Sequence, residues 1–546
     1  MRTLCFAALL STAACAAQTS ADSAAPGSGG GVSFGGAQDI GEFRGILDRG
    51  GIPGASTLDA NGFFNEHLNA PFATSCGQLL CIATGMSVGR DWMTGAHQAT
   101  LQIAVQSTVD PTTYQRAPMN LVVVIDHSGS MASDGRLTKV KGGLHTLIDN
   151  LHDDDQLAVV EFDDRVDLDA PLAALDRPRL HAIIDRLAPR GSTNIYDGLA
   201  TGFRQLGDAL PSNRQNRVIF LSDGNATAGD TVRSHILAMA ADQVRRGIGL
   251  TTIGVGNDFD VELMRGLAEQ GAGNFYFLED PTAAREVFTE ELDYFMQPIA
   301  LDLQVTATAG PGYQLGEIAG SHLWQAQLSS GAMQIPAVFV ASRTSAGGGL
   351  GRRGGGSMLF IHMTPIGGAT GKVATVALSY RAPGSSERLT QTVQLDYAAD
   401  PAVTPEQPYL SAPQMAERFA MYNTYLGLRA ATLSYDPGCA AAILRATRAG
   451  ADAWNRTHED PDLAADLTLI DQYLANLAAR GAVPERALAS CPTAAGPSPT
   501  PEPAPYPYPY PTDDVRYQRA CSAGGPGAGL PIVLAALGVI ARRRRR

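Results

Sequence analysis

Residues 119–295 alternate short apolar runs with amphipathic helical patterns, and this alternation limits the possible fold more than any other feature of the chain. The runs contain few polar positions, which is typical of parallel strands buried on both faces. The segments between them place apolar residues three and four positions apart, as a helix with one buried face requires. We therefore predict a doubly wound α/β domain with helices on both sides of a mostly parallel sheet. The predicted strands are LVVVI, QLAVVEF, RVIFLS, LTTIGVG and NFYFL.

The pattern changes after residue 298, where five apolar runs follow one another without a helical segment and predict an antiparallel β-sandwich. A further strand is predicted at 98–107, before the α/β domain, where its backbone groups would lack partners. We therefore predict that residues 85–118 pair with 299–397, which makes the α/β domain, at 119–298, an insertion in the sandwich. Residues 403–491 are rich in Ala and Leu at helical spacing and are predicted to form a domain of three or four helices. The overall class is thus multidomain, α/β plus β plus α.

The N-terminal region has the composition of an export signal. Residues 1–18 combine one positive charge, a short apolar core and small residues, which is the plan of a secretory signal. Within it, STAAC resembles a bacterial lipoprotein box with Cys15 as the lipidated residue, and ordinary cleavage in the Ala-rich stretch is the alternative. Residues 19–40 are predicted to be a flexible tether, and 41–84 an N-terminal segment with two short ordered elements.

The C-terminal region has a Pro-rich spacer at 492–520 and a signal-like segment at 521–546. The apolar stretch Leu530–Ala541 would extend about 18 Å as a helix, too short for a hydrocarbon core of about 30 Å. With the five arginines that follow, this segment resembles the sorting signals read by rhombosortase or myxosortase enzymes. A permanent short anchor is the alternative. Both readings predict an exported protein, attached to the membrane in the cell envelope or on the outer surface of a Gram-negative-type bacterium.

Seven cysteines suit an oxidising compartment. Cys5 and Cys15 belong to the leader and Cys521 to the C-terminal segment, which leaves an even number in the body of the protein. We expect a Cys76–Cys81 disulfide that closes a small loop and a Cys439–Cys491 disulfide across the helical region. A zinc site is the rival interpretation, but no histidine lies at ligand spacing near either pair.

Oxygen-bearing side chains follow two of the predicted strands and precede one helix. Asp126, Ser128 and Ser130 come directly after LVVVI, Thr193 lies in GSTNIYDGL before a helix, and Asp223 follows RVIFLS. Open α/β sheets bind their ligands at the carboxyl ends of the strands, so we expect these five side chains to converge. Two acids and three hydroxyls suit Mg²⁺, Mn²⁺ or Ca²⁺ better than zinc. His127, inside the first motif, is interpreted as a loop residue and not as a ligand.

These three motifs resemble the metal-ion-dependent adhesion site of von Willebrand factor A domains. The segment from 119 to about 295 is similar to the exported bacterial members described as chloride-channel-like or inter-alpha-inhibitor-like. The resemblance implies that Ser128, Ser130 and Thr193 bind a divalent cation, with Mg²⁺ as the first choice. It also implies that Asp126 and Asp223 act on the cation directly or through water.

Three neutral hydroxyls leave the charge of a divalent cation poorly neutralised, so an Asp or Glu of a protein partner can complete its coordination. We therefore predict a surface-attached, metal-dependent protein-binding module of the adhesion type and not an enzyme. A net charge of −13 argues against nucleic-acid binding. The alternatives are an accessory factor that works with an AAA ATPase or assembles a metalloenzyme, against which the leader argues, and a hydrolase with its site in the helical region. The glycine-rich stretch at 345–357 lacks the Gly-Lys-Ser/Thr ending of a phosphate-binding loop.

Overall fold

The computed structural model describes residues 32–34, 40–69, 72, 76–109, 116–210, 214–256, 259–278, 287–288, 298–340, 357–366, 371–397, 408–481 and 483–491. The predicted leader with Cys15, most of the tether, the Pro-rich spacer and the C-terminal signal lie outside the described residues, as does most of the glycine-rich stretch. Within the described ranges, no helix combines the length and the apolar character needed to cross a membrane.

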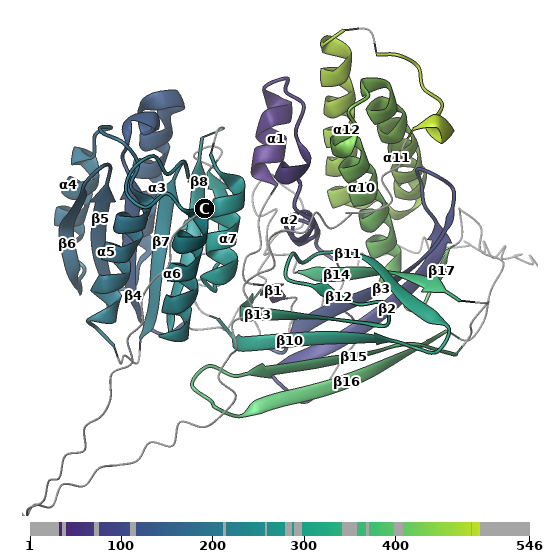
Figure 1. The fold of residues 1–546 in the computed structure, drawn as a ribbon, viewed down its shortest axis with the longest axis horizontal. Helices are drawn as coiled ribbons and strands as arrows, with labels where there is room; N and C mark the ends of the chain where they lie inside the picture. Colours follow the sequence, from purple (N-terminus) through teal and green to yellow (C-terminus); the bar gives the residue numbers. More distant parts are fainter. Residues whose placement is uncertain are drawn as a thin grey trace, which may run out of the picture. The chain divides into compact units, whose positions relative to one another are not determined.

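Six strands form the predicted α/β sheet, in the order β6-β5-β4-β7-β8-β9 (Figure 1). All neighbours in this sheet are parallel except β6, which runs antiparallel to β5 at one edge. The strands are β4 Met119–Asp126, β5 Gln156–Phe162, β6 Val166–Ala174, β7 Gln215–Ser222, β8 Ile248–Val255 and β9 Phe275–Leu278. The doubly wound fold expected from the sequence is confirmed, and β6 is an additional strand that the apolar runs did not indicate.

Helices cover both faces of this sheet, which explains why its strands are almost continuously apolar. Along β4, Leu121 and Val123 pack into a core with α3 and α4, whereas Val122 and Val124 pack into a second core with α5, α6 and α7. The helices are η2 Gly129–Gly135, α3 Arg136–Asn150, α4 Arg177–Arg186, α5 Ile195–Gly207, α6 Arg233–Arg245 and α7 Val261–Gln270. The first two helical patterns of the sequence correspond to α3 and α4.

Two antiparallel sheets form the β-sandwich, in the orders β11-β14-β3-β2-β17 and β1-β13-β10-β15-β16, with β12 paired to β13. Apolar side chains of both sheets share one core. The strands are β1 Val32–Phe34, β2 Leu80–Arg90, β3 His97–Ser107, β10 Ala300–Ala309, β11 Tyr313–Ala319, β12 Gln325–Ala326, β13 Ser330–Val340, β14 Met358–Pro365, β15 Gly371–Arg381, β16 Arg388–Tyr397 and β17 Tyr409–Leu410.

The strand predicted at 98–107 pairs with two strands of the sandwich. It corresponds to β3, which lies between β2 and β14, with Ile103 opposite Leu359 of β14. The chain therefore leaves the sandwich after β3, forms the α/β sheet, and is back in the sandwich at β10.

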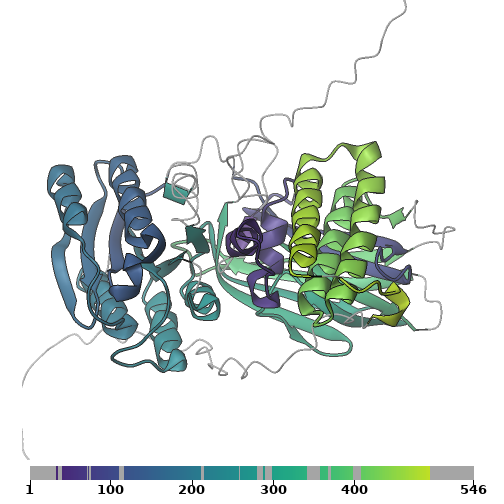
Figure 2. The same ribbon diagram turned by 90° about the horizontal axis from the view of Figure 1, so that it is seen from above.

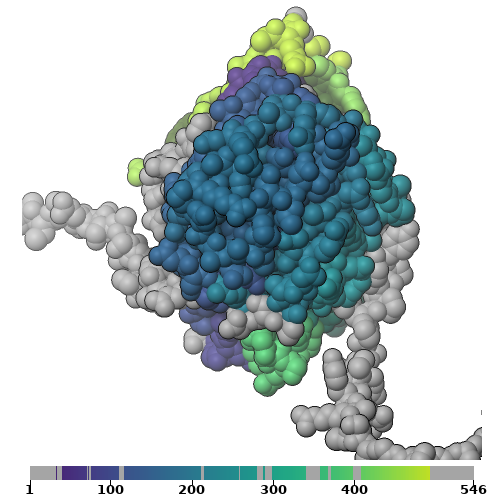
Figure 3. Space-filling model, turned by 90° about the vertical axis from the view of Figure 1, so that its left-hand side faces the viewer, coloured from purple at the N-terminus to yellow at the C-terminus, as the bar shows by residue number. Residues whose placement is uncertain are grey.

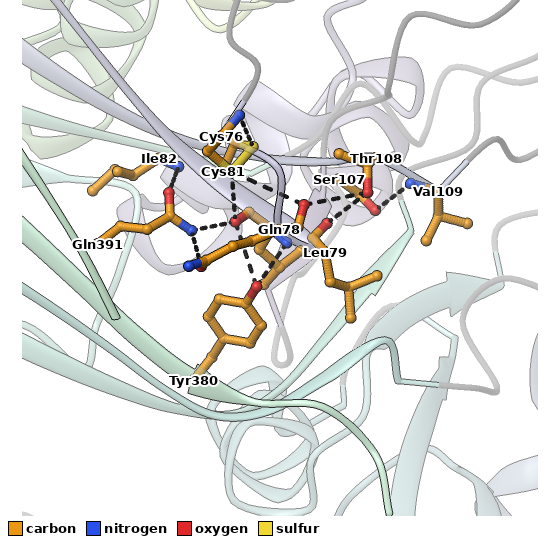
Figure 4. The surroundings of a disulfide bond; sticks show 11 residues. Cys76, Gln78, Leu79, Cys81, Ile82, Ser107, Thr108, Val109, Tyr380 and Gln391 are labelled. Carbon is orange, nitrogen blue, oxygen red and sulfur yellow. Dashed lines mark hydrogen bonds between the residues drawn. A yellow bond between two sulfur atoms is a disulfide. The ribbon is translucent and has the colours of Figure 1, made fainter. Parts of the chain in front are cut away.

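The Cys76–Cys81 disulfide is confirmed and lies where the chain enters β2 (Figure 4). Two side chains of the opposite sheet bind the backbone beside it. The Tyr380 hydroxyl accepts from the amide of Leu80 at 3.0 Å, and the Gln391 carboxamide oxygen accepts from the amide of Ile82 at 3.2 Å. The small loop is thus attached to both sheets of the sandwich.

The region after the sandwich contains three helices, α10 Met415–Leu433, α11 Pro437–His458 and α12 Pro461–Ala479, followed by η4 Leu488–Ser490. The second predicted disulfide, Cys439–Cys491, is also present and joins the start of α11 to the residue after η4. Figures 1 and 2 show these helices, in yellow-green, on the side of the sandwich formed by β2, β3, β11 and β14. Met415 of α10 packs there against Ala83 and Ala104.

The N-terminal segment, predicted as a unit of its own, shares a hydrophobic core with the three C-terminal helices. Its elements are α1 Gly41–Asp48, η1 Ala55–Thr57 and α2 Ala60–Asn65. Phe43 packs edge-on against Tyr473 of α12, and Phe64 contacts Tyr425 of α10. Short helices of six to eight residues cannot bury an apolar face alone, and the helical region supplies the missing surface.

Candidate metal centre

The five predicted ligands lie at one rim of the α/β sheet. Asp126 is the last residue of β4, Ser128 caps η2, Ser130 lies inside η2, and Asp223 directly follows β7. Thr193 precedes Asn194, the N-cap of α5. Ser130 is exposed and the other four are buried. The rim therefore opens to solvent on the side of the Ser130 hydroxyl.

Hydrogen bonds fix the first loop of the site. One carboxylate oxygen of Asp126 accepts from the amide of Ser128 at 2.8 Å, and the other accepts from the Ser222 hydroxyl at 2.5 Å. The hydroxyls of Ser128 and Ser130 lie 3.1 Å apart. The strand end and the turn after it thus place one carboxyl group and two hydroxyls side by side.

The loop that carries Thr193 is bound to both neighbouring loops through its backbone. The amide of Gly129 donates to the Gly191 carbonyl at 3.1 Å, and the amides of Thr227 and Ala228 donate to the Thr193 carbonyl at 2.9 and 3.0 Å. Gly191 has a φ of +68°, and a β-carbon there would meet the Asp164 carboxylate at 2.3 Å, so this position requires glycine. Thr193 joins the site through this loop.

His127 connects the same loops. Its Nδ1 lies 2.9 Å from the Ala188 carbonyl, and its own carbonyl accepts from the amide of Arg190 at 2.8 Å. Both contacts hold the first loop of the site against the segment that leads to Thr193.

The two acids of the site are buried close to each other, and they differ in their partners. Burial and the nearby charge of Asp223 raise the pKa of Asp126 to about 6, although hydrogen bonds from Ser128 and Ser222 oppose the shift. One oxygen of Asp223 accepts from Arg136 Nη1 at 3.1 Å. Its other oxygen is buried and has no hydrogen-bond partner among the described residues. An unpartnered buried carboxylate oxygen is costly, and a cation beside it would lower that cost.

The donor set fits a hard divalent cation. Carboxylate and hydroxyl oxygens are the ligand types that Mg²⁺, Mn²⁺ and Ca²⁺ prefer. In the described part of the chain, no group of three or more His, Cys, Asp and Glu side chains is arranged to hold a metal ion. A cation at this rim would therefore depend on the serine and threonine hydroxyls in addition to the two acids.

Sequence reasoning missed Arg136 and Ser222, which both contact the acids of the site. Ser222 is adjacent to Asp223 within FLSDG, so a search for hydroxyls near the motif could have found it. Arg136 lies ten residues after Asp126, at the start of α3, where no sequence signal separates it from a solvent-exposed charge. Its side chain is buried against Asp223, which only the packing of α3 on the sheet determines.

Comparisons with known proteins agree with the fold of this unit. The family model of the von Willebrand factor type A domain matches residues 120–290. The protein YfbK of Escherichia coli is 30% identical over 197 residues, which is 36% of this chain and 34% of YfbK. The Synechocystis protein sll0103 is 31% identical over 195 residues, or 35% of this chain and 45% of that protein.

More distant similarity extends to animal proteins and to a solved structure. Mouse inter-alpha-trypsin inhibitor heavy chain H2 is 27% identical over 172 residues, or 30% of this chain and 18% of that protein. The structure of a von Willebrand factor type A protein from Catenulispora acidiphila has a TM-score of 0.44 at 17% identity and covers 74% of this chain and 90% of that one.

The chain spans less than half the length of the curated relatives described above. The similarity thus concerns the α/β unit, and domains of this type generally mediate protein–protein interaction and adhesion. They are typically not enzymes, and they often bind a divalent metal. Residues 120–290 are therefore a von Willebrand factor type A domain, through which this chain is related to YfbK and to the inter-alpha-trypsin inhibitor heavy chains.

Proposed function

We propose that this protein binds a protein partner through a divalent cation at the rim of its von Willebrand factor A domain. The partner supplies an Asp or Glu side chain that completes the coordination of the cation. The observation that carries this proposal is the buried Asp223 oxygen without a partner, next to the buried carboxyl of Asp126. The proposed ligands are Asp126, Ser128, Ser130, Thr193 and Asp223.

The balance of charge at the rim supports an acidic partner. Arg136 already offsets the charge of Asp223, so the two acids together leave about one negative charge at the site. The hydroxyls of Ser128, Ser130 and Thr193 add ligands without adding charge. A bound divalent cation supplies the positive charge that attracts a carboxylate. Because Ser130 is exposed, the partner would approach from that side.

The choice of cation follows from the ligand types. Mg²⁺ usually binds one or two carboxylates and keeps several waters, which fits a site with two acids and three small hydroxyls. We propose Mg²⁺ as the physiological cation, with Mn²⁺ as a close substitute and Ca²⁺ as the third option.

We also propose that the protein acts outside the cytoplasm, attached to the cell envelope. Its two disulfides suit an oxidising compartment. The attachment would come from a lipid on Cys15 or from residues 521–546. Removal of 521–546 should release the protein into the medium if this segment is the anchor. An unchanged distribution in cell fractionation would leave the lipid on Cys15 as the anchor. If neither the removal of 521–546 nor the loss of the lipid on Cys15 releases the protein, attachment through these two segments is wrong.

Titration calorimetry with the purified full chain tests the metal site. The wild type should bind one Mg²⁺ or Mn²⁺ with micromolar to millimolar affinity, and Thr193→Val should lose this binding, because the change removes one hydroxyl and keeps the shape of the side chain. Ser192→Ala removes an exposed hydroxyl one position away and should bind like the wild type. Equal binding by Thr193→Val and the wild type would refute the site.

A pulldown from the outer-surface proteins of the source cells tests the function. Partners should be retained in Mg²⁺ and released by EDTA, and Thr193→Val should retain none of them. A partner that stays bound in EDTA and to Thr193→Val would show that binding occurs elsewhere on the chain.

A further inference from the structure

Two His-x-x-x-Asp segments on neighbouring helices bring two histidines and two aspartates into contact, away from the rim. HTLID at 145–149 belongs to α3, and HAIID at 181–185 belongs to α4. Residues four positions apart lie on one face of a helix, so each helix presents a histidine and an aspartate together. The helices α3 and α4 are neighbours in the α/β unit (Figure 1), and residues of that unit, in blue, occupy most of the face shown in Figure 3.

The two histidines face each other across the helix–helix contact. His145 Nδ1 lies 2.6 Å from His181 Nδ1, the ring centroids are 4.9 Å apart, and the ring planes differ by 26°. Their side chains are 32% and 29% exposed, so both rings can be reached from solvent.

Each histidine uses its other nitrogen to bind an aspartate of the opposite helix. His145 Nε2 lies 3.1 Å from Asp185, and His181 Nε2 lies 3.0 Å from Asp149. An ionised carboxylate can only accept, so each Nε2 carries a hydrogen and donates it. In a neutral imidazole, this leaves Nδ1 as an acceptor with its lone pair in the plane of the ring.

The crossed arrangement thus directs two nitrogen acceptors at each other. Two lone pairs at 2.6 Å repel unless a cation lies between them, and the two flanking carboxylates add negative potential that favours one. A carboxylate on the far nitrogen is also the usual outer partner of a metal-binding histidine, because it fixes the tautomer and makes the free nitrogen more basic.

We propose that His145 and His181 bind a late transition-metal cation, Zn²⁺ or Cu²⁺, through their two Nδ1 atoms. The Zn–N distance is about 2.0–2.1 Å, and a tetrahedral angle separates two such nitrogens by roughly 3.3 Å. The rings therefore have to move apart by less than about 1 Å, which two partly exposed side chains can do. Within the described residues, no third His, Cys, Asp or Glu is grouped with them, so water fills the remaining positions.

This site differs in kind from the rim of the domain. Imidazole nitrogens select zinc and copper, whereas carboxylate and hydroxyl oxygens select magnesium, manganese and calcium. A cation between His145 and His181 would join α3 to α4. The proposal does not depend on the function of the rim.

Calorimetry with ZnCl₂ tests this site on the tag-free full chain at neutral pH, in excess Mg²⁺ so that the oxygen site is occupied. His145→Gln and His181→Gln should each lose one equivalent of Zn²⁺ that the wild type binds. His235→Gln is the matched control, because His235 Nδ1 lies 2.7 Å from one aspartate, Asp230, and no second histidine faces it among the described residues. Thr193→Val should keep the equivalent, which separates this site from the rim.

The outer carboxylates and the spectrum of bound copper provide two further measurements. Asp149→Asn and Asp185→Asn should each weaken Zn²⁺ binding about 10- to 100-fold without abolishing it. Cu²⁺ bound to the wild type should show hyperfine coupling to two nitrogens in its paramagnetic resonance spectrum. The proposal is wrong if His145→Gln binds as many equivalents as the wild type, or if the pair takes up a proton and excludes both metals.

Discussion

Asp223 is buried beside a positively charged side chain, since Arg136 Nη1 lies 3.1 Å from one of its carboxylate oxygens. Arg136→Met removes this charge and keeps much of the side-chain volume. We expect the metal-free protein to lose roughly 3–5 kcal/mol of stability, because a buried carboxylate then lacks its partner. We also expect tighter Mg²⁺ binding, since one repelling charge is gone.

Thermal denaturation with and without Mg²⁺ measures both effects of Arg136→Met. The metal-induced rise in Tm should be larger in this variant than in the wild type. Lys139→Met, on the same helix and outside the site, should leave the rise unchanged. A smaller rise in Arg136→Met would show that the arginine orients Asp223 for the metal and does not oppose it.

Asp126 makes the metal-free protein sensitive to pH. Its pKa is about 6 in the folded chain, above the ordinary value of 3.8, so the folded state binds this proton more tightly than the unfolded state. The contribution of Asp126 to the free energy of unfolding therefore falls as the pH rises from about 4 to about 6 and stays low above that range. Asp126→Asn removes the charge and should stabilise the protein by roughly 2–3 kcal/mol at neutral pH.

Urea denaturation of wild type and Asp126→Asn in EDTA, at several pH values, measures this difference. The gap in the free energy of unfolding should be small near pH 4, open between about pH 4 and 6, and remain constant above. In Mg²⁺ the order should reverse, because only the wild type gains stability from the cation. A gap that does not change with pH would contradict the raised pKa.

At the scale of single elements, the strands that the sequence predicted best are those buried on both faces. QLAVVEF matches β5 to the residue, because both faces of this strand are covered and need apolar side chains. The edge strand β6, VDLDAPLAA, was missed because it is largely exposed and contains Pro171.

The strand β2 shows a different limit of sequence reasoning. It contains Gly85 and Gly89, which weaken a strand pattern. A β-carbon at Gly85 would lie 2.3 Å from Met415 of α10, and one at Gly89 would lie 2.7 Å from Phe419. The glycines make room for a helix more than 300 residues away, which no local pattern reveals. In the same way, the motifs of the candidate site predicted its acids and hydroxyls, and the contact from Arg136 depended on tertiary packing.

The two disulfides should contribute unequally to stability, because they close loops of different length. Cys439–Cys491 spans 52 residues and Cys76–Cys81 spans 5. Chain entropy alone gives about 4 kcal/mol for the longer loop and about 2 kcal/mol for the shorter one. We expect the double substitution Cys439→Ser/Cys491→Ser to lower the free energy of unfolding by more than Cys76→Ser/Cys81→Ser, as measured in urea. The reverse order would mean that the contacts of Tyr380 and Gln391 with the small loop depend on its disulfide.

At the scale of the whole described chain, a buried ion pair connects the N-terminal segment to the last long helix. His67 Nε2 lies 2.8 Å from Asp466 of α12. Burial opposes a charge on His67, but the charge and hydrogen bond of Asp466 outweigh it and raise the pKa of His67 to about 9. The folded state therefore binds this proton more tightly, and the stabilisation is complete below about pH 6.5 and is lost as the pH rises through about 9.

His67→Gln should accordingly destabilise the protein most at slightly acid pH and progressively less above pH 7. Urea denaturation between about pH 6 and 10 gives the difference from the wild type at each pH. His152→Gln changes an exposed histidine and is the control for the substitution itself. A constant difference across this range would mean that His67 is neutral in the folded protein.

The α/β unit is connected to the sandwich by two passages of the chain and by a packed contact. The guanidinium of Arg217, in β7, lies 5.2 Å from the ring centroid of Phe339 in β13, and Ala272 packs with Phe339 and Ala337. We expect this contact to make the two units unfold together. Phe339→Ala removes it and should cost roughly 3–5 kcal/mol.

Calorimetric melting distinguishes loss of this contact from a general loss of stability. The wild type should melt in one transition, and Phe339→Ala should separate it into two, one for the α/β unit and one for the sandwich with its helices. Phe360→Ala is the matched control, because Phe360 is equally buried but packs against Phe64 and Tyr422, within the sandwich and helices. This control should lower Tm and keep a single transition. If both variants melt in one step, the two chain passages and the remaining contacts, such as those of α7 with β13 and of α1 with β9, are sufficient to couple the units. A partner bound at the rim could then transmit force to the sandwich without the Arg217–Phe339 contact.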